Sequence, residues 1–329
     1  MREWDGQLVS PRHRRRWPRP PHFVLAATVL VVLLLCLPLS WQHANASTAS
    51  APAASAPAAS APAASAPATS LLAPPSEGLR LARHLIVVAC HAVYTAEDHG
   101  HAALQRETSW FLEPFQHGQL ETMLEHIKRG VELAAADNRS VVLFSGGHTR
   151  AEAGPRSEAL SYWEVAEAEG WFGHPHARAR AHLEEQARDS FENVLFSICR
   201  FNELVGSYPT RITFVSFDFK RRRFESLHRE ALRFPSRRFE FVGIDPPGLS
   251  ESVVTAERTQ SARPFESDPY GCSEPVLLRK RIERNPFRHS ISYPQGCPEL
   301  RALISECHSQ IYSGALPWSL PAESLLFTL

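Results

Sequence analysis

Apolar residues gather into four short runs in the middle of the chain, at residues 84–89, 141–145, 211–219 and 239–245, of which the first is continuous. Each run has the length of a strand, and such runs are typical of strands buried on both faces of a sheet. Between them, apolar positions recur at helical spacing in residues 118–135, 157–170 and 189–201, and a basic helix is predicted to begin at Lys220. Strands that alternate with helices over short connections predict an α/β fold with a doubly wound, mainly parallel sheet.

A longer apolar stretch, residues 23–39, precedes this pattern and is followed by Trp41. It is just long enough to cross a hydrocarbon core of about 30 Å. We predict a basic cytoplasmic N-terminus at residues 1–22, a single transmembrane signal-anchor at residues 23–41 and a lumenal remainder, which is type II topology. The alternative is a signal peptide cleaved near Ala46, which would release a secreted domain. Five arginines before the stretch set this orientation: Arg12, Arg14, Arg15, Arg16 and Arg19.

Residues 42–78 form a low-complexity linker of alanine, proline and serine, in which APAAS repeats three times and APATS follows. Proline at every fifth position prevents a continuous helix, so we expect a disordered, extended tether. The globular domain is predicted at residues 79–248. Residues 249–329 are rich in proline and charge, and we expect a loop-rich extension that packs on the domain, with a helix only at residues 299–311.

The balance of charged residues argues against nucleic acid as a partner. Lysine and arginine number 35, as do aspartate and glutamate, so the formal net charge is zero and no basic footprint for nucleic acid is present. Two sequons, at Asn45 and Asn138, are possible N-glycosylation sites and agree with a lumenal domain in the endomembrane system.

The six cysteines match no zinc spacing, so we predict no metal site. Cys90 and Cys199 fall within apolar patterns and are interpreted as small buried hydrophobic residues. Cys272 and Cys297 lie in the C-terminal extension, where an oxidising lumen would allow a bridge between them.

The run at residues 141–145 leads into Ser145-Gly146-Gly147-His148-Thr149, at the edge where open α/β sheets place ligands. Free glycine amides there could hold an anion or carboxylate, with hydroxyls such as that of Thr149 donating to it. The alternative is a simple turn, since glycine tolerates positive φ. The spacing fits neither of the common nucleotide-binding loops.

Two further groups should reach the same edge. Glu185, Asp189, Ser190, Glu192 and Asn193 could take ribose hydroxyls or an amino group, although Asp189 and Glu192 also fit a capping box. Asp218 lies near the end of one predicted strand, and His91 lies at the end of another. Asp218 has an alternative role as a helix cap, and a lone histidine such as His91 is more often structural.

These residues carry a resemblance. Ser145-Gly146-Gly147, then Ser157-Glu158-Ala159, then Glu185 ahead of Asp189-Ser190-Phe191-Glu192-Asn193, resemble the DUF218 family, which includes YdcF-, SanA- and ElyC-like bacterial envelope proteins. The match covers residues 83–247. Residues 268–272 and 284–287 resemble the extension of a eukaryotic branch, whose members are often single-pass membrane proteins of the endomembrane system.

The resemblance implies a Rossmann-like fold and, for a YdcF-like member, binding of S-adenosylmethionine. This sequence departs from the pattern where Cys90-His91-Ala92 replaces a glycine-rich turn and where Asp189-Ser190 replaces the usual threonine. The pocket that the resemblance implies consists of Ser145, Gly146, Gly147, Glu158, Glu185, Glu192 and Asn193.

Together these features predict a membrane-tethered lumenal domain that binds a small polar metabolite at the carboxyl edge of its sheet, and they leave its reaction, and whether it is an enzyme, open. The alternative is a non-enzymatic factor of the secretory pathway or envelope. It would bind an acidic partner through two basic segments, residues 220–223 and 280–284, which begin at Lys220 and Lys280.

Overall fold

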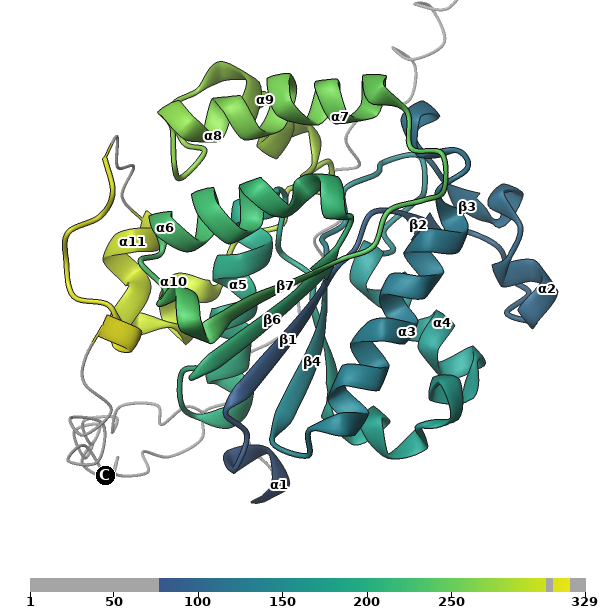
Figure 1. Cartoon of the computed structure of the whole chain (residues 1–329), viewed down its shortest axis with the longest axis horizontal. Helices are drawn as coiled ribbons and strands as arrows, with labels where there is room; N and C mark the ends of the chain where they lie inside the picture. The colour runs from purple at the N-terminus through teal and green to yellow at the C-terminus, as the bar shows by residue number, and fades with distance from the viewer. Residues whose placement is uncertain (1–76, 306–309, 320–329) are drawn as a thin grey trace, which may run out of the picture. The chain divides into compact units, whose positions relative to one another are not determined.

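Five strands form a single parallel sheet in the order β5-β4-β1-β6-β7. The computed structural model describes residues 77–305 and 310–319 (Figure 1). The chain runs from central β1 outward through β4 to β5, then crosses to β6 and β7, a Rossmann-like order that confirms the predicted α/β class. The strands are β1 (His84–Ala89), β4 (Ser140–Ser145), β5 (Ala181–Glu184), β6 (Arg211–Ser216) and β7 (Phe239–Gly243).

Both faces of the sheet are covered by helices, which explains the continuous apolar strands. In β1, Leu85 and Val87 pack with α5 (Ser190–Val205), whereas Ile86 and Val88 pack with α3 (Leu120–Ala136) and α4 (Glu158–Ala168). Figure 1 shows α3 and α4 on one side of the sheet and α5 with α6 (Arg229–Ala231) on the other. The smaller elements before α3 are α1 (Glu77–Arg80), β2 (Val93–Tyr94), α2 (His101–Leu104) and β3 (Trp110–Phe111).

The structure differs from the prediction in three elements. β5 was not predicted, because its four residues, AHLE, include a histidine and an acid and lack a continuous apolar run. The strand predicted at residues 211–219 ends at Ser216, and the basic helix after it is divided into three short pieces. They are η5 (Asp218–Lys220), the π-helix η6 (Arg222–His228) and α6.

The C-terminal extension packs on the domain as predicted, but the expectation that it is loop-rich is wrong. Short helices make up much of it, and α7, α8 and α9 lie at the end of the sheet toward which the strands run (Figure 1). Leu277, Tyr293 and Leu300 are buried in the same core as α5. The helices are α7 (Glu251–Glu257), η8 (Arg258–Ala262), α8 (Arg263–Ser267), α9 (Pro275–Glu283), α10 (Tyr293–Gly296) and α11 (Arg301–Ser305).

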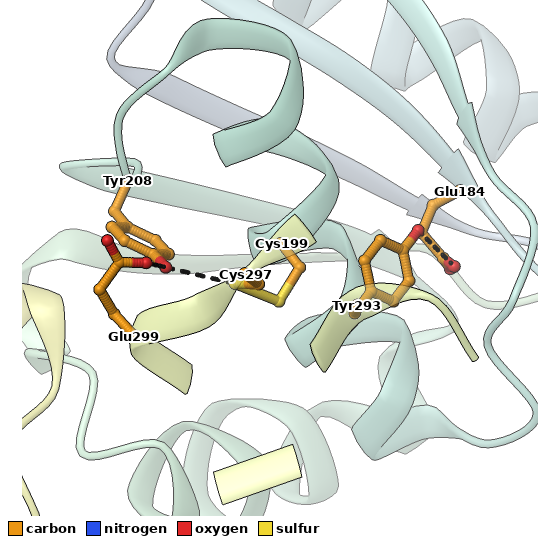
Figure 2. The surroundings of a disulfide bond; sticks show 6 residues. All are labelled: Glu184, Cys199, Tyr208, Tyr293, Cys297 and Glu299. Atoms are coloured by element: carbon orange, nitrogen blue, oxygen red, sulfur yellow. Dashed lines mark hydrogen bonds between the residues drawn. A yellow bond between two sulfur atoms is a disulfide. The ribbon is translucent and has the colours of Figure 1, made fainter. Parts of the chain in front are cut away.

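A disulfide joins Cys199 in α5 to Cys297, the residue after α10 (Figure 2). The predicted Cys272–Cys297 bridge is therefore wrong, as is the interpretation of Cys199 as a plain buried residue. Cys272 is disulfide-bonded as well. Cys90 is buried and free, as predicted.

Several predictions fall on residues outside the described ranges. They are the cytoplasmic N-terminus, the signal-anchor, most of the linker, the cleavage position near Ala46 and the sequon at Asn45. Asn138 is described, and it lies exposed in the turn between α3 and β4. Within residues 77–305 and 310–319, no helix has the length and apolar character needed to cross a bilayer.

Candidate functional site

A cavity of about 270 Å³ opens at the carboxyl ends of three neighbouring strands. Cys90 and His91 follow β1, Gly146 follows β4, and Phe217 follows β6. The strand order reverses between β1 and β6, and this is the place where open α/β sheets bind ligands. Residues of η2 (Pro114–Gln116), α7, η8 and α9 complete the wall. The C-terminal extension from residue 249, hereafter the tail, therefore lines part of the cavity whose other walls follow the strands.

The structure brings together seven of the twelve predicted binding residues in this cavity, and they come from four separate segments of the chain. The cavity therefore lies where the sequence patterns placed a site. The seven are His91, Gly146, Thr149, Glu158, Asp189, Ser190 and Asn193.

The glycine turn after β4 does not offer free amides, so its predicted role as an anion cradle is wrong. The Gly146 amide donates to the carbonyl of Glu184 at 3.0 Å, and the Gly147 amide donates to the carbonyl of Ala187 at 3.0 Å. Neither glycine has a positive φ. They are needed for space, because a Cβ at Gly146 would lie 2.8 Å from Oε2 of Glu158 and one at Gly147 would lie 2.7 Å from the Ala187 oxygen.

Glu158 begins α4 and projects a carboxylate into the cavity wall. Ser157 caps this helix, because its Oγ accepts from the Leu160 amide at 2.8 Å and donates to Glu185 at 2.7 Å. The Thr149 hydroxyl donates to the Glu158 carboxylate. No lysine or arginine of the described residues forms an ion pair with Glu158, although its carboxylate acts electrostatically on Lys220 and Arg284.

Asp189 caps α5, which confirms the structural alternative for this residue: its Oδ1 accepts from the Glu192 amide at 2.9 Å. The full capping box does not form, because the Glu192 carboxylate instead pairs with Arg188 at 2.5 Å. Arg281 of α9 binds Asp189 at 2.6 Å and Glu192 at 3.3 Å. Burial alone would raise the pKa of Asp189, but the Arg281 charge holds it below its usual value.

Ser190 and Asn193 line the cavity and also bind the protein. The Ser190 Oγ lies 2.8 Å from Nε2 of His228, and burial lowers the pKa of that histidine well below its ordinary value, so the ring is neutral. The Asn193 amide donates to the hydroxyl of Ser145 at 2.9 Å and to its carbonyl at 3.0 Å.

The other five predicted residues, Ser145, Gly147, Glu185, Glu192 and Asp218, lie outside the cavity. Ser145 is buried beneath it, and Glu192 is held by arginines. Glu185 instead lines an open groove that contains His148 and His289. Asp218 belongs to η5 and pairs with Arg221 at 2.6 Å, so it is neither a cavity residue nor the cap of the helix that follows.

Glu184 is a buried acid that the sequence patterns missed. It is fully buried, and its Oε2 accepts from the Ser145 hydroxyl at 2.6 Å. The Tyr293 hydroxyl, from the tail, donates to Oε1 at 3.2 Å (Figure 2). Burial raises the pKa of Glu184 to about 7. The signal that could have identified it is strand register, since Glu184 lies directly opposite Ser145 once β5 is recognised.

Positive charge dominates the cavity wall. Six lysines and arginines line it against three carboxylates, those of Glu158, Asp189 and Glu257. Four of these cations come from the two basic segments at residues 220–223 and 280–284, which therefore meet inside the cavity. The six are Arg150, Arg188, Lys220, Arg223, Lys280 and Arg284.

His91 and Cys90, which line the cavity at the end of β1, are uncharged. Burial, and after it the charge of Lys220, lowers the pKa of His91 well below its ordinary value, so His91 is neutral; its Nε2 lies 3.3 Å from the Ser216 hydroxyl. Burial also raises the pKa of the Cys90 thiol, with Glu158 and Glu184 adding to the effect. Cys90 is therefore a thiol rather than a reactive thiolate. Among the described residues no group of histidine, cysteine and acidic side chains could hold a metal ion.

The chain is similar to a curated protein of yeast. The uncharacterized protein YOR238W of Saccharomyces cerevisiae (strain ATCC 204508 / S288c) is 28% identical over 299 residues, which cover 73% of this chain and 98% of the yeast protein. No family model matches the chain, and no solved structure matches it. The comparison supports distant homology to the yeast protein, and the resemblance to the DUF218 family stays a prediction.

Proposed function

We propose that this protein is a membrane-tethered lumenal domain that binds a small polar metabolite in the cavity at the carboxyl edge of its sheet. The observation that carries the proposal is the position of the cavity at the β1–β6 crossover. Polar side chains from several loops converge there, and the tail encloses them. The Cys199–Cys297 disulfide supports an oxidising compartment. Secretion after cleavage near Ala46 would place the domain in the same environment.

S-adenosylmethionine, which the family resemblance implies, does not fit the residues present. Its sulfonium is a cation, and the cavity wall carries more lysines and arginines than carboxylates. Two of its three acids are already paired, Asp189 with Arg281 and Glu257 with Arg223. We therefore assign no reaction step to S-adenosylmethionine. The site favours a ligand that is neutral or negatively charged.

The alternative, an acidic protein partner bound by the two basic segments, is weakened by their placement. Lys220, Arg223, Lys280 and Arg284 all line the cavity. Arg222, which is exposed, already pairs with Glu266. A cavity of about 270 Å³ admits a small molecule rather than a protein surface.

Native mass spectrometry of the full-length protein, purified in mild detergent from a eukaryotic host, tests the proposal. The Ala256→Phe variant fills the cavity from α7 without removing a polar contact, and it should lose any co-purifying ligand. Thr255→Phe, an exposed position on the same helix, is the matched control and should keep it. Equal ligand retention by wild type and Ala256→Phe would place the bound molecule elsewhere and refute the proposal.

A further inference from the structure

Three cations in the cavity wall have no carboxylate partner, in contrast to the others around them. Arg223 pairs with Glu257 at 3.1 Å. Arg150 pairs with Glu113, and Arg188 pairs with Glu192, two acids that do not line the cavity. Lys220, Lys280 and Arg284 form no ion pair with any acid of the described residues. The cavity thus holds three unpaired cations and one carboxylate outside any ion pair, that of Glu158.

The contacts of these three cations are with neutral groups. The Lys220 ammonium lies 4.7 Å from the ring centroid of Phe217. Lys280 donates to the carbonyl of Gln260 at 2.6 Å. Arg284 donates to the carbonyl of Arg188 at 3.1 Å. Each cation is therefore held by neutral groups and forms no ion pair within the described residues, although the carboxylates of Glu158, Asp189 and Glu257 act on these charges from a distance.

The three cations lie close enough to repel one another, although they are far apart in the sequence. Burial lowers the pKa of Lys220 to about 7, and the charges of Arg223 and Arg284 contribute to the shift. Burial likewise lowers the pKa of Lys280 to about 8, and Arg284 again contributes. Positive potential is therefore concentrated in one enclosed volume with a low local dielectric.

We propose that the ligand of this cavity carries a dianionic phosphoryl group bound by Lys220, Lys280 and Arg284. This inference rests on the proposed function and names its ligand class. With Glu158 counted and both lysines protonated, the unpaired groups leave an excess of two positive charges, which a phosphate ester of charge about −1.5 to −2 would balance. Lysine binds phosphate as a point charge, and the arginine fork can donate two parallel hydrogen bonds to its oxygens. A single carboxylate would leave half of the excess uncompensated.

Two phenylalanine rings of the cavity wall are available to contact the organic part of such a ligand. Phe115 lines the cavity although its side chain is 60% exposed, and Phe219 lines it beside Lys220. An apolar group that covered these rings would lose contact with water while its phosphoryl group remained among the cations. The site is therefore expected to bind a phosphate ester more tightly than inorganic phosphate.

Isothermal titration of the full-length protein with inorganic phosphate, phenyl phosphate, sulfate, succinate and benzoate tests the ligand class. Phenyl phosphate should bind most tightly and benzoate most weakly. Lys280→Gln and Arg284→Gln should each weaken phenyl phosphate binding by about 10-fold or more, because each removes a charge-assisted hydrogen bond. Arg222→Gln is the matched control, since Arg222 is exposed outside the cavity and pairs with Glu266, and it should bind as wild type does.

Phenyl phosphate binding unchanged in both Lys280→Gln and Arg284→Gln would overturn the inference, as would equal affinity for benzoate and phenyl phosphate. Thermal unfolding of each variant shows whether a loss of binding reflects a loss of fold. A co-purifying ligand that Ala256→Phe loses but whose mass excludes phosphorus would refute the phosphoryl group and leave the proposed function standing. A ligand retained by Ala256→Phe would refute both.

Discussion

The disulfide between α5 and the tail should be a major source of stability, and removing it provides a quantitative test of the structure. The change is Cys199→Ala together with Cys297→Ala, which leaves no unpaired thiol from this bond. The two cysteines are 98 residues apart in the sequence. In the chain-entropy account, closing a loop of about 100 residues stabilises a fold by about 4.7 kcal/mol, because the cross-link restricts the unfolded chain.

The melting temperature should fall accordingly. For a domain of 150–250 residues, each kcal/mol shifts the melting temperature by about 2–4 °C, so the double variant should melt about 9–19 °C below wild type. Contacts on either side of the bond should keep the tail partly docked. Tyr293 still donates to Glu184 at 3.2 Å, and Tyr208 still donates to Glu299 at 2.6 Å (Figure 2).

The assay is thermal unfolding under non-reducing conditions, combined with peptide mapping that confirms the Cys199–Cys297 bond in wild type. Cys90→Ala is the control, because Cys90 is buried but free, and this substitution should cost only about 1 kcal/mol through lost packing. A double variant that melts within about 3 °C of wild type would refute the reasoning. The tail would then be held by side-chain packing alone, and the cross-link would add little.

Three further results are expected. Because burial raises the folded pKa of Glu184 to about 7, above its ordinary 4.5, its protonated form stabilises the fold at low pH, and this contribution, on the order of 3 kcal/mol, is lost as the pH rises from about 4.5 through 7. The free energy of unfolding of Glu184→Gln, relative to wild type at the same pH, should therefore increase between pH 4.5 and 7, and a difference that does not change with pH would contradict the assignment. Gly146→Ala should destabilise by about 1–3 kcal/mol in urea unfolding through overpacking, whereas Gly78→Ala, with open space around it, should be neutral. Sulfate, whose charge is constant above pH 4, should bind at least about 10-fold more weakly at pH 9 than at pH 6.5, because Lys220 and Lys280, with pKa values of about 7 and 8, lose their charge; equal affinity at both pH values would place the sulfate elsewhere.

The strands could be predicted because their signal is local. Leu85, Ile86, Val87 and Val88 are all fully buried, so no polar residue interrupts the pattern. β5 lacks this signal, and its last residue, Glu184, is an acid that is buried only because Ser145, Tyr293 and backbone amides donate to it. An isolated sequence gives no sign of such partners.

The helices of the tail could not be predicted from the sequence for a different reason. In α9 only Leu277 is buried, so helical periodicity is almost absent and its other residues are exposed or partly exposed. This helix forms where Leu277 enters the core and Arg281 reaches Asp189, and both interactions are long-range. Of the two glycines after β4, only Gly146 lines the cavity, and both are needed for a reason other than the predicted one. Close approach of Glu158 and Ala187 requires them, and sequence alone does not distinguish that requirement from a positive φ.

The position of the unpaired cations links ligand binding to the docking of the tail. The whole chain has as many acids as bases, so Lys220, Lys280 and Arg284 do not lack partners because acids are scarce. Lys220 belongs to the connection after β6, whereas Lys280 and Arg284 belong to the tail. Their mutual repulsion opposes tail docking, while the Arg281–Asp189 pair and the Cys199–Cys297 bond favour it. An anion placed between the two groups would turn that repulsion into attraction, and a ligand that binds only the docked form must stabilise it. The tail is therefore part of the binding site as well as its cover, and a fragment that ended at residue 248 would lose two of the three cations.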